Sequence, residues 1–252
     1  MRFQKPRQLA LVFAILATSA ACAEGEALSA EQLLGNMLAA IGPERSRQAV
    51  QSLSTTAEGS GPDGLFAITV TSIPPDTVYF RQQSERGITE IWSTPERTWG
   101  GDAGDEYEPL GMRVRDFVRS HEFHLMLLEM KSRFSGFELQ GEDAVSGKEC
   151  LRVSMIDEAG ETASICIRLD DWLPAELRLN PSSVAGPIRI VFDDWRVVDG
   201  LNQFHSLELT EDSDRLFTYE YVDIAVNTFA YEIRVPPPTV PRVHGDGSSG
   251  AQ

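Results

Sequence analysis

The chain has 252 residues, a formal net charge of −16 at pH 7 and a hydrophobic fraction of 42%. The acidic balance argues against nucleic acid and against electrostatic docking on anionic lipid headgroups, because both partners are negatively charged. The apolar fraction is ordinary for a globular fold and too high for a disordered chain. We therefore expect a folded, acidic protein with one large core.

Residues 1–23 have the layout of a secretory signal. Three basic residues precede a short apolar run, Leu9 to Ala17, and small residues follow. This run is too short to span a bilayer as a stable helix, so the sequence predicts export across a bacterial inner membrane. Residues 21–23 form an ordinary signal-peptidase site, which would release a soluble chain. Residues 19–22 also form a lipobox, which would make Cys22 a lipidated N-terminus. The mature protein would then contact a membrane only through Cys22. Both outcomes stay open.

The first predicted helix begins after Ser29, which can form a capping box with Gln32. Apolar residues then recur at helical spacing and predict one buried face: Leu33, Leu34, Met37, Leu38 and Ile41. Gly42-Pro43 ends this helix. A second short helix is predicted to carry Ala49, Val50 and Leu53. The period then changes to two, which predicts the strands Leu65–Ser72, Thr77–Gln82 and Gly87–Ser93. Residues 100–111 are rich in glycine and acids and are predicted to form a loop.

One long helical stretch is predicted from Met112 to Phe134. Between Phe123 and Met130 its apolar residues cover nearly the whole circumference, so we expect burial on more than one side. Seven more strands follow: Phe137–Val145, Glu149–Ile156, Thr162–Leu169, Ala175–Leu179, Ile188–Val198, Leu201–Leu209 and Arg215–Asn227. Residues 229–235 form a candidate edge strand, and residues 236–252 are predicted to be a disordered tail. The pattern favours an α+β or half-barrel design with about ten or eleven antiparallel strands.

Cys150 and Cys166 lie in one predicted hairpin, on either side of a turn at residues 157–160. The register that pairs Val153 with Ala163 also pairs the two cysteines. In that register they could form a disulfide in an oxidising periplasm. Two free thiols on a polar face are the alternative.

Motifs that carry catalysis or bind cofactors are weak in this sequence. His121 and His124 flank Glu122 at a spacing of three, whereas a zincin needs a spacing of four, and no further ligand motif follows. The pairs Asp170-Asp171 and Asp193-Asp194 resemble glycosidase carboxylates only in residue type, because adjacent strand residues point to opposite faces. We therefore predict no enzyme, no metal and no cofactor. A hydrolase that uses one aspartate of each pair is the least favoured alternative.

Several segments, in their order along the chain, resemble the periplasmic lipoprotein-carrier family, LolA/LolB-like, also called outer-membrane lipoprotein-sorting proteins. These segments are Ala39–Gly42, Leu53–Gly59, Pro75–Arg81, Arg97–Gly101, Val145–Val153, Ile167–Pro174, Asp194–Leu201 and Asp223–Asn227. The resemblance covers roughly residues 29–235, within a predicted domain of residues 24–235. It implies an unclosed antiparallel β-barrel whose concave, apolar face is covered by helices. It also implies that acyl chains are held on that face, and that Arg81 helps to hold a helical lid.

The leading hypothesis is a non-catalytic periplasmic carrier for a lipid or a lipoprotein acyl chain, which it would pass to an envelope protein acceptor. The predicted ligand-binding residues are Phe66, Ile68, Val70, Phe80, Arg81, Ile91, Trp99, Phe117, Leu125 and Leu128. The helix that carries Phe117, Leu125 and Leu128 would be the cover. The alternative is a structural or protein-interaction module of the cell envelope that has the same fold and a packed core.

Overall fold

The computed structural model describes residues 28–103, 107–181, 186–212 and 215–228. The signal segment with Cys22, the candidate edge strand at residues 229–235 and the tail at residues 236–252 lie outside these residues. The strands are β1 Leu53–Gly61, β2 Gly64–Ile73, β3 Thr77–Ser84, β4 Gly87–Ser93, β5 Thr98–Asp102, β6 Glu108–Leu110, β7 Phe134–Val145, β8 Lys148–Asp157, β9 Thr162–Arg168, β10 Pro174–Leu179, β11 Ile188–Val198, β12 Leu201–Glu211 and β13 Arg215–Val226.

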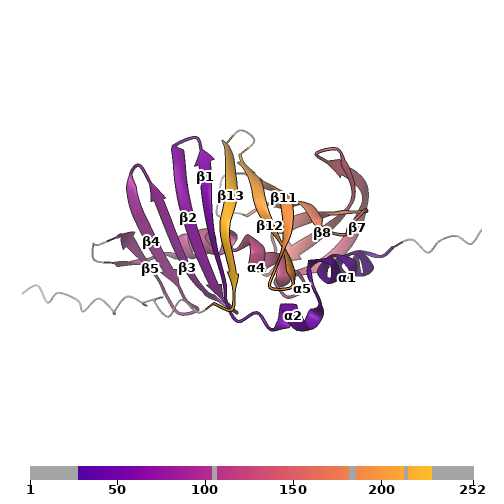
Figure 1. Cartoon of the computed structure of the whole chain (residues 1–252), viewed down its shortest axis with the longest axis horizontal. Coiled ribbons are helices and arrows are strands. Elements are labelled where there is room, and N and C mark those ends of the chain that lie inside the picture. Colours follow the sequence, from indigo (N-terminus) through magenta and orange to yellow (C-terminus); the bar gives the residue numbers. More distant parts are fainter. Residues whose placement is uncertain (1–27, 104–106, 182–185, 213–214, 229–252) are drawn as a thin grey trace, which may run out of the picture.

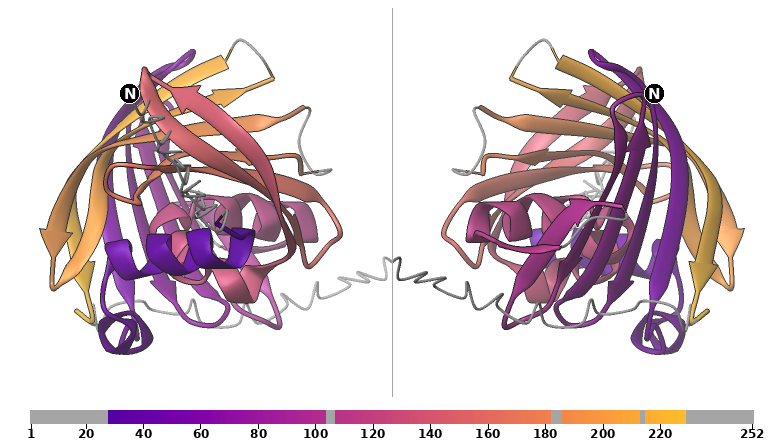
Figure 2. Two further views of the ribbon diagram at one scale, coloured as in Figure 1. Left: turned by 90° about the vertical axis from the view of Figure 1, so that its right-hand side faces the viewer. Right: turned by 90° about the vertical axis from the view of Figure 1, so that its left-hand side faces the viewer.

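The strands form one antiparallel sheet of 13 strands in the described residues, in the order β6-β5-β4-β3-β2-β1-β13-β12-β11-β10-β9-β8-β7. The sheet bends into a half-barrel (Figures 1 and 2). The barrel does not close, because β6 and β7 stand at opposite ends of the strand order. This is the unclosed antiparallel α+β architecture that we expected. The strand count is higher than expected, partly because β5 and β6 extend into residues 100–111, which were predicted as a loop.

The helices are α1 Ala30–Ile41, α2 Glu44–Gln48, α3 Met112–Ser120, α4 Phe123–Leu128 and α5 Met130–Arg133. The predicted capping box opens α1: Gln32 N donates to Ser29 Oγ at 3.2 Å, and Ser29 N donates to Gln32 Oε1 at 2.8 Å. The whole apolar stripe of α1 is buried, and the helix packs against α4, β7 and β12. No helix in the described part of the chain is long and apolar enough to cross a membrane.

The prediction of one long helix from Met112 to Phe134 is wrong. The chain leaves the helix at His121 and Glu122 and bends again at Glu129, so three short helices replace one. All six residues of α4 are buried, whereas Val118 is the one buried residue of α3. A straight helix could not place an all-apolar segment in the core and also keep a charged segment at the surface. The bend at His121 and Glu122 resolves this conflict.

The hairpin that carries the two cysteines has a different register from the predicted one. Val153 pairs with Ile165, so Cys150 lies opposite Arg168 and Cys166 lies opposite Arg152. The turn is longer than expected, because Asp157 Oδ1 accepts from Glu161 N at 2.8 Å. A shift of two residues keeps every side chain on its predicted face. A disulfide therefore still joins Cys150 and Cys166, diagonally across the two strands, with their Cα atoms 5.6 Å apart.

Candidate ligand-binding cavity

The two faces of the half-barrel differ in chemistry. Val70, Phe80 and Ile91 lie opposite one another on β2, β3 and β4, and their side chains point to the concave face, where α3, α4 and α5 lie (Figure 2). All three are buried. We call the other side of the sheet the convex face. It carries the intervening residues, such as Arg81 on β3 and Glu90 on β4.

Most predicted ligand-binding residues lie on the concave side. Phe66, Ile68 and Val70 alternate along β2, and the ring of Phe80 lies 5.6 Å from that of Phe117 on α3. Leu125 and Leu128 belong to the same core cluster and line neither of the two cavities described next.

Two of the predicted residues lie on the wrong face. Arg81 is paired with Glu90, with its Nε 3.7 Å from Oε1, and Trp99 lies opposite Trp92 on the convex face. Arg81 follows Phe80 directly, and Trp99 lies between Thr98 and Gly100. Since neighbouring strand residues alternate between faces, neither side chain can share the concave face with Phe80.

The larger cavity on the concave face has a volume of about 600 Å³. It lies beside the turns that join β1 to β2, β3 to β4 and β12 to β13. Its apolar lining comes from Ile68, Phe66, Phe117, Phe217 and Tyr219. Charged residues stand at its rim and are tied in pairs: Arg86 Nη2 lies 3.0 Å from Asp63 Oδ1, and Arg215 Nη1 lies 3.6 Å from Glu211 Oε2. Gln82, Thr89 and His121 also line the cavity, so its wall is mixed, with aromatic and aliphatic side chains beside polar ones.

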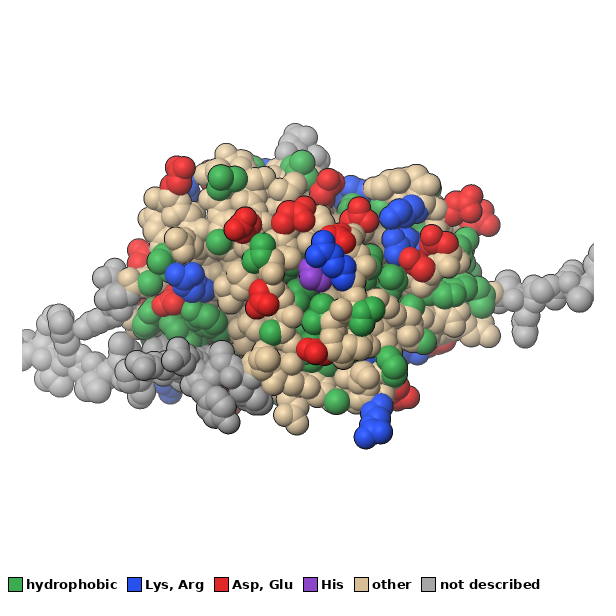
Figure 3. All heavy atoms as spheres, viewed as in Figure 1, with side chains coloured by type: hydrophobic (Ala, Val, Ile, Leu, Met, Phe, Trp, Pro, Cys, Tyr) green, Lys and Arg blue, Asp and Glu red, His purple; other side chains and the backbone are tan. Residues whose placement is uncertain are grey.

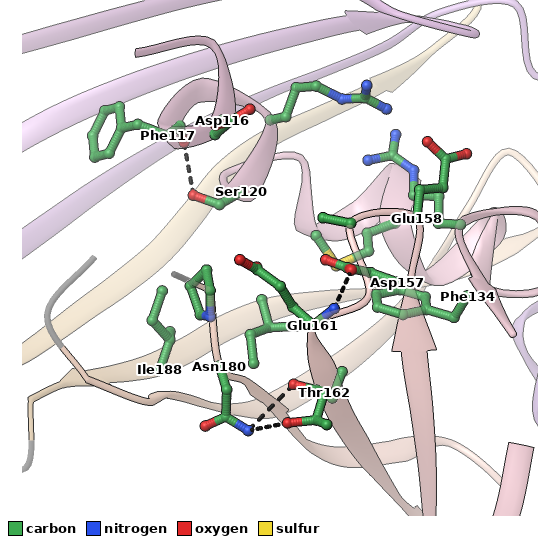
Figure 4. Close-up of a pocket in the computed structure, with 17 residues that line it drawn as sticks. Asp116, Phe117, Ser120, Phe134, Asp157, Glu158, Glu161, Thr162, Asn180 and Ile188 are labelled. Atoms are coloured by element: carbon green, nitrogen blue, oxygen red, sulfur yellow. Dashed lines mark hydrogen bonds between the residues drawn. The ribbon is translucent and has the colours of Figure 1, made fainter. Parts of the chain in front are cut away.

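A second cavity, of about 340 Å³, lies on the other side of α3. Figure 4 shows α3, with Asp116, Phe117 and Ser120, across from the β8–β9 segment that carries Asp157, Glu158 and Glu161; the ring of Phe117 points away from that segment. The apolar lining includes Met126, Phe134, Ala163, Leu179 and Ile188. Phe117 lines both cavities, and its side chain is 37% exposed. α3 therefore separates two hollows of one concave face.

Val118 anchors α3 in the core, where it is fully buried, and the remaining contacts of this helix are few. The ring of Phe117 contacts that of Phe80 edge-on. An ion pair adds to this contact, with Arg119 Nη1 2.9 Å from Asp76 Oδ1. Arg115 Nη1 also donates to the carbonyl oxygen of Pro95 at 3.1 Å. These contacts are largely polar and partly exposed, so they are weakened by solvent.

A buried carboxylate connects the three helices of the concave face. Glu122 is 4% exposed, and its Oε2 lies 3.4 Å from Arg133 Nη1 on α5 and 3.9 Å from Arg119 Nε on α3. Burial raises the pKa of Glu122, and the charges of Arg133 and Arg119 together with a hydrogen bond to Ser72 oppose that rise. Arg133 Nε also donates to Glu129 Oε2 at 2.8 Å.

The two histidines of the His121–His124 segment do not form a pair. His121 lies among the rings of Phe80, Phe117 and Phe123, and burial lowers its pKa. His124 stacks on Phe204 at 3.8 Å, and its Nε2 donates to the carbonyl oxygen of Phe204 at 3.0 Å. Burial lowers the pKa of His124 to about 3. Within the described residues, no group of three or more His, Cys, Asp or Glu side chains is arranged to hold a metal ion.

The two aspartate pairs contact neighbouring basic side chains. Asp171 accepts from Arg168 Nε at 2.8 Å, Asp194 accepts from Arg196 Nε at 2.9 Å, and Asp193 pairs with Lys148 at 3.5 Å. Asp170 and Asp193 are largely exposed. None of the four aspartates lines either of the two concave cavities.

The arrangement of strands and helices was compared with solved structures. A DUF1329 family protein from Desulfovibrio piger has a TM-score of 0.54 and 13% identity, over 79% of this chain and 93% of that one. A LolA superfamily protein from Nitrosomonas europaea has a TM-score of 0.54 and 11% identity, over 81% and 96%. This chain has the LolA-like fold. A putative outer membrane lipoprotein-sorting protein domain from Vibrio parahaemolyticus has a TM-score of 0.52 and 12% identity, over 79% and 94%.

At these identities the LolA-like likeness concerns the fold alone. No protein-family model and no curated protein matches the sequence of this chain. The argument for a function therefore rests on the fold together with the concave cavities.

Sequence reasoning missed part of the lining. Phe217 and Tyr219 on β13 were assigned to a strand but not to the site, although their spacing of two places them on one face. Met126 and Phe134 were expected to be buried, and they also line the second cavity.

Proposed function

We propose that this chain is a non-catalytic binding or carrier protein that holds an acyl chain of a lipid or lipoprotein in the larger concave cavity. The observation that carries the proposal is the hollow of about 600 Å³ inside a LolA-like fold, lined by Ile68, Phe66, Phe117, Phe217 and Tyr219. Its volume falls within the range of about 300–1,000 Å³ that is typical of ligand pockets. Each methylene moved from water into such a site contributes about 0.8 kcal/mol.

The proposal places the acyl chain beside α3 and its polar end among the charged pairs of the rim. Phe117 would rest on the bound chain, because its ring lines both cavities. Because residues 1–23 are predicted to be a secretory signal, we propose that the protein works in the periplasm, either soluble or anchored through Cys22. A protein of the envelope would accept the cargo.

A second candidate is an envelope interaction module without cargo. The observation that favours it is the burial of α4, because all six of its residues are buried and fill part of the concave face. This candidate predicts that apolar probes do not enter the larger cavity.

A matched pair of glutamines on β3 separates the two candidates. Gln82 lines the larger cavity, whereas Gln83 is exposed and alternates to the convex face. We expect Gln82→Trp to fill the cavity and weaken the binding of a fluorescent fatty acid by about tenfold or more, since several methylenes lose their apolar contacts. Gln83→Trp should bind as the natural chain does.

The measurement is a fluorescence titration of the three proteins with the same probe. Equal binding by both tryptophan variants would place the probe elsewhere on the surface. Absence of binding by all three proteins would favour the interaction module.

A further inference from the structure

A fully buried carboxylate lies on the convex face, apart from both concave cavities. Glu176 on β10 is 0% exposed. Arg152 Nη2 lies 2.7 Å and Arg178 Nε lies 2.6 Å from its Oε1, and Arg189 Nε lies 2.5 Å from its Oε2. A buried carboxylate is costly unless it is paired and hydrogen-bonded, so Glu176 depends on these three guanidinium groups.

The three arginines are not equivalent. The side chain of Arg152 is 11% exposed, and its Nε also donates to Asp143 Oδ2 at 2.8 Å, so its charge is matched within the fold. The side chains of Arg178 and Arg189 are 47% and 43% exposed. They lie directly opposite each other on β10 and β11, where two like charges repel. Glu176 holds the two guanidinium groups together at the surface.

Most hydrogen-bond donors of this arginine pair are unused. A guanidinium group has five N–H donors. Arg189 Nε donates to Glu176 Oε2, and Arg178 Nε forms an ion pair with Oε1. Among the described residues, none accepts from the Nη atoms of Arg178 or Arg189 in a recorded hydrogen bond. The neighbours in the same row of the sheet, Ser164 on β9 and Thr210 on β12, are uncharged. The two carboxylates nearby, Glu176 and Asp143, balance two of the charges of Arg152, Arg178 and Arg189, so the cluster keeps one positive charge and free Nη donors on a chain of net charge −16.

We propose that Arg178 and Arg189, fixed by Glu176, form a surface site for a phosphoryl group. Arginine forks match phosphate geometry, and a phosphoryl group offers enough oxygens to accept from two forks at once. Glu176 fixes the side chains of Arg178 and Arg189 before binding, so less conformational entropy is lost when the ligand binds. Acidic and basic side chains are interspersed on the face seen in Figure 3, so the site acts by short-range contact rather than by long-range attraction.

Free phosphate and a phospholipid headgroup share this chemistry. The first test is a titration with inorganic phosphate at constant ionic strength, followed by NMR of the arginine Nε–H groups. We expect saturable shifts at Arg178 and Arg189. Arg189→Lys keeps the charge but loses the fork, and it should weaken binding by about tenfold. Arg196→Lys is the control, because Arg196 is a second exposed arginine of β11 and pairs with Asp194 instead.

Vesicle sedimentation then identifies the source of the phosphoryl group. If the headgroup is the ligand, the protein sediments with phosphatidylglycerol vesicles more than with vesicles of digalactosyldiacylglycerol, a lipid without phosphate, and Arg189→Lys removes the difference. If both vesicles behave alike while inorganic phosphate still binds, free phosphate is the ligand.

The proposal is overturned if the arginine shifts follow ionic strength alone, or if Arg189→Lys binds phosphate as tightly as the natural chain. Neither measurement depends on the concave cavity, so this site and the acyl cavity can fail independently.

Discussion

The helices α3 and α4 are neighbours in sequence and differ sharply in how the fold holds them. α4 buries all six of its residues between α1 and the sheet, whereas α3 buries Val118 alone and leaves Phe117 partly exposed between two cavities. Both follow from local sequence: Phe123–Leu128 has no charged side chain, and α3 alternates apolar residues with arginines and Asp116. One helix completes the core, and the other partly covers the concave face.

This difference bears on how a cavity protein works. A cover that opens must lose few contacts, because segments with low burial open at low free energy while core segments open only on global unfolding. α3 meets that condition and α4 does not. The predictions that follow test the contrast, from the largest expected effect to the smallest.

Truncation should separate the two helices most clearly. Leu125→Ala removes a side chain that is 2% exposed, and we expect it to lower the free energy of unfolding by about 2–5 kcal/mol. Phe117→Ala, in α3, should cost clearly less, because its ring is 37% exposed and borders empty space. Urea denaturation of both variants measures the difference. Equal losses would mean that α3 is part of the core.

Acid should destabilise the protein through α4. The folded pKa of His124 is lowered to about 3 from 6.5, so the folded state favours the neutral ring. Its contribution to stability is complete above pH 6.5 and is lost as the pH falls toward 3. The loss amounts to about 1.4 kcal/mol for each pH unit in that window.

Comparison with His124→Gln isolates this contribution. Unfolding free energies at pH 6, 5 and 4 should fall more steeply for the natural chain than for the variant, by about the amount given above for each pH unit. Parallel curves would show that His124 titrates normally and is not held in the core.

Loosening α3 should have the smallest effect on stability. Asp76→Asn removes the ion pair to Arg119 and leaves Arg119 beside Glu122. The side chains of Arg119 and Asp76 are 27% and 31% exposed, and we expect a loss of about 1 kcal/mol or less. Hydrogen exchange of the α3 amides should nevertheless become faster, while that of the α4 amides stays unchanged. Exchange that accelerates equally in both helices would contradict the contrast, because it would show that they open together.

The sequence predicted the sheet well where alternation was strong. Phe66, Ile68 and Val70 on β2 share the concave face as expected, and the capping box of Ser29 and Gln32 starts α1 where predicted. The order of motifs also led to the LolA-like fold. These features depend on local periodicity and capping, which a single sequence contains.

The remaining features depend on tertiary packing. The apolar residues around Phe123–Met130 fit one buried helix or several short ones equally well, so the bend at His121 and Glu122 was not visible. The cavity itself depends on how far side chains fill the half-barrel, and composition does not determine that. Arg81 is a different case. Strand alternation already excludes it from the concave face, because it follows Phe80 directly, and its prediction as a binding residue rested on the resemblance to the carrier family.

The most direct test of the acyl-binding proposal is native mass spectrometry of the full chain, purified without detergent from a membrane-containing host, followed by lipid extraction. We expect a stoichiometric adduct whose extract contains an acyl chain, and we expect the adduct to be lost in Gln82→Trp and retained in Gln83→Trp. A bare polypeptide mass for the natural chain, together with no uptake of added fatty acid, would contradict the account and favour a packed interaction module.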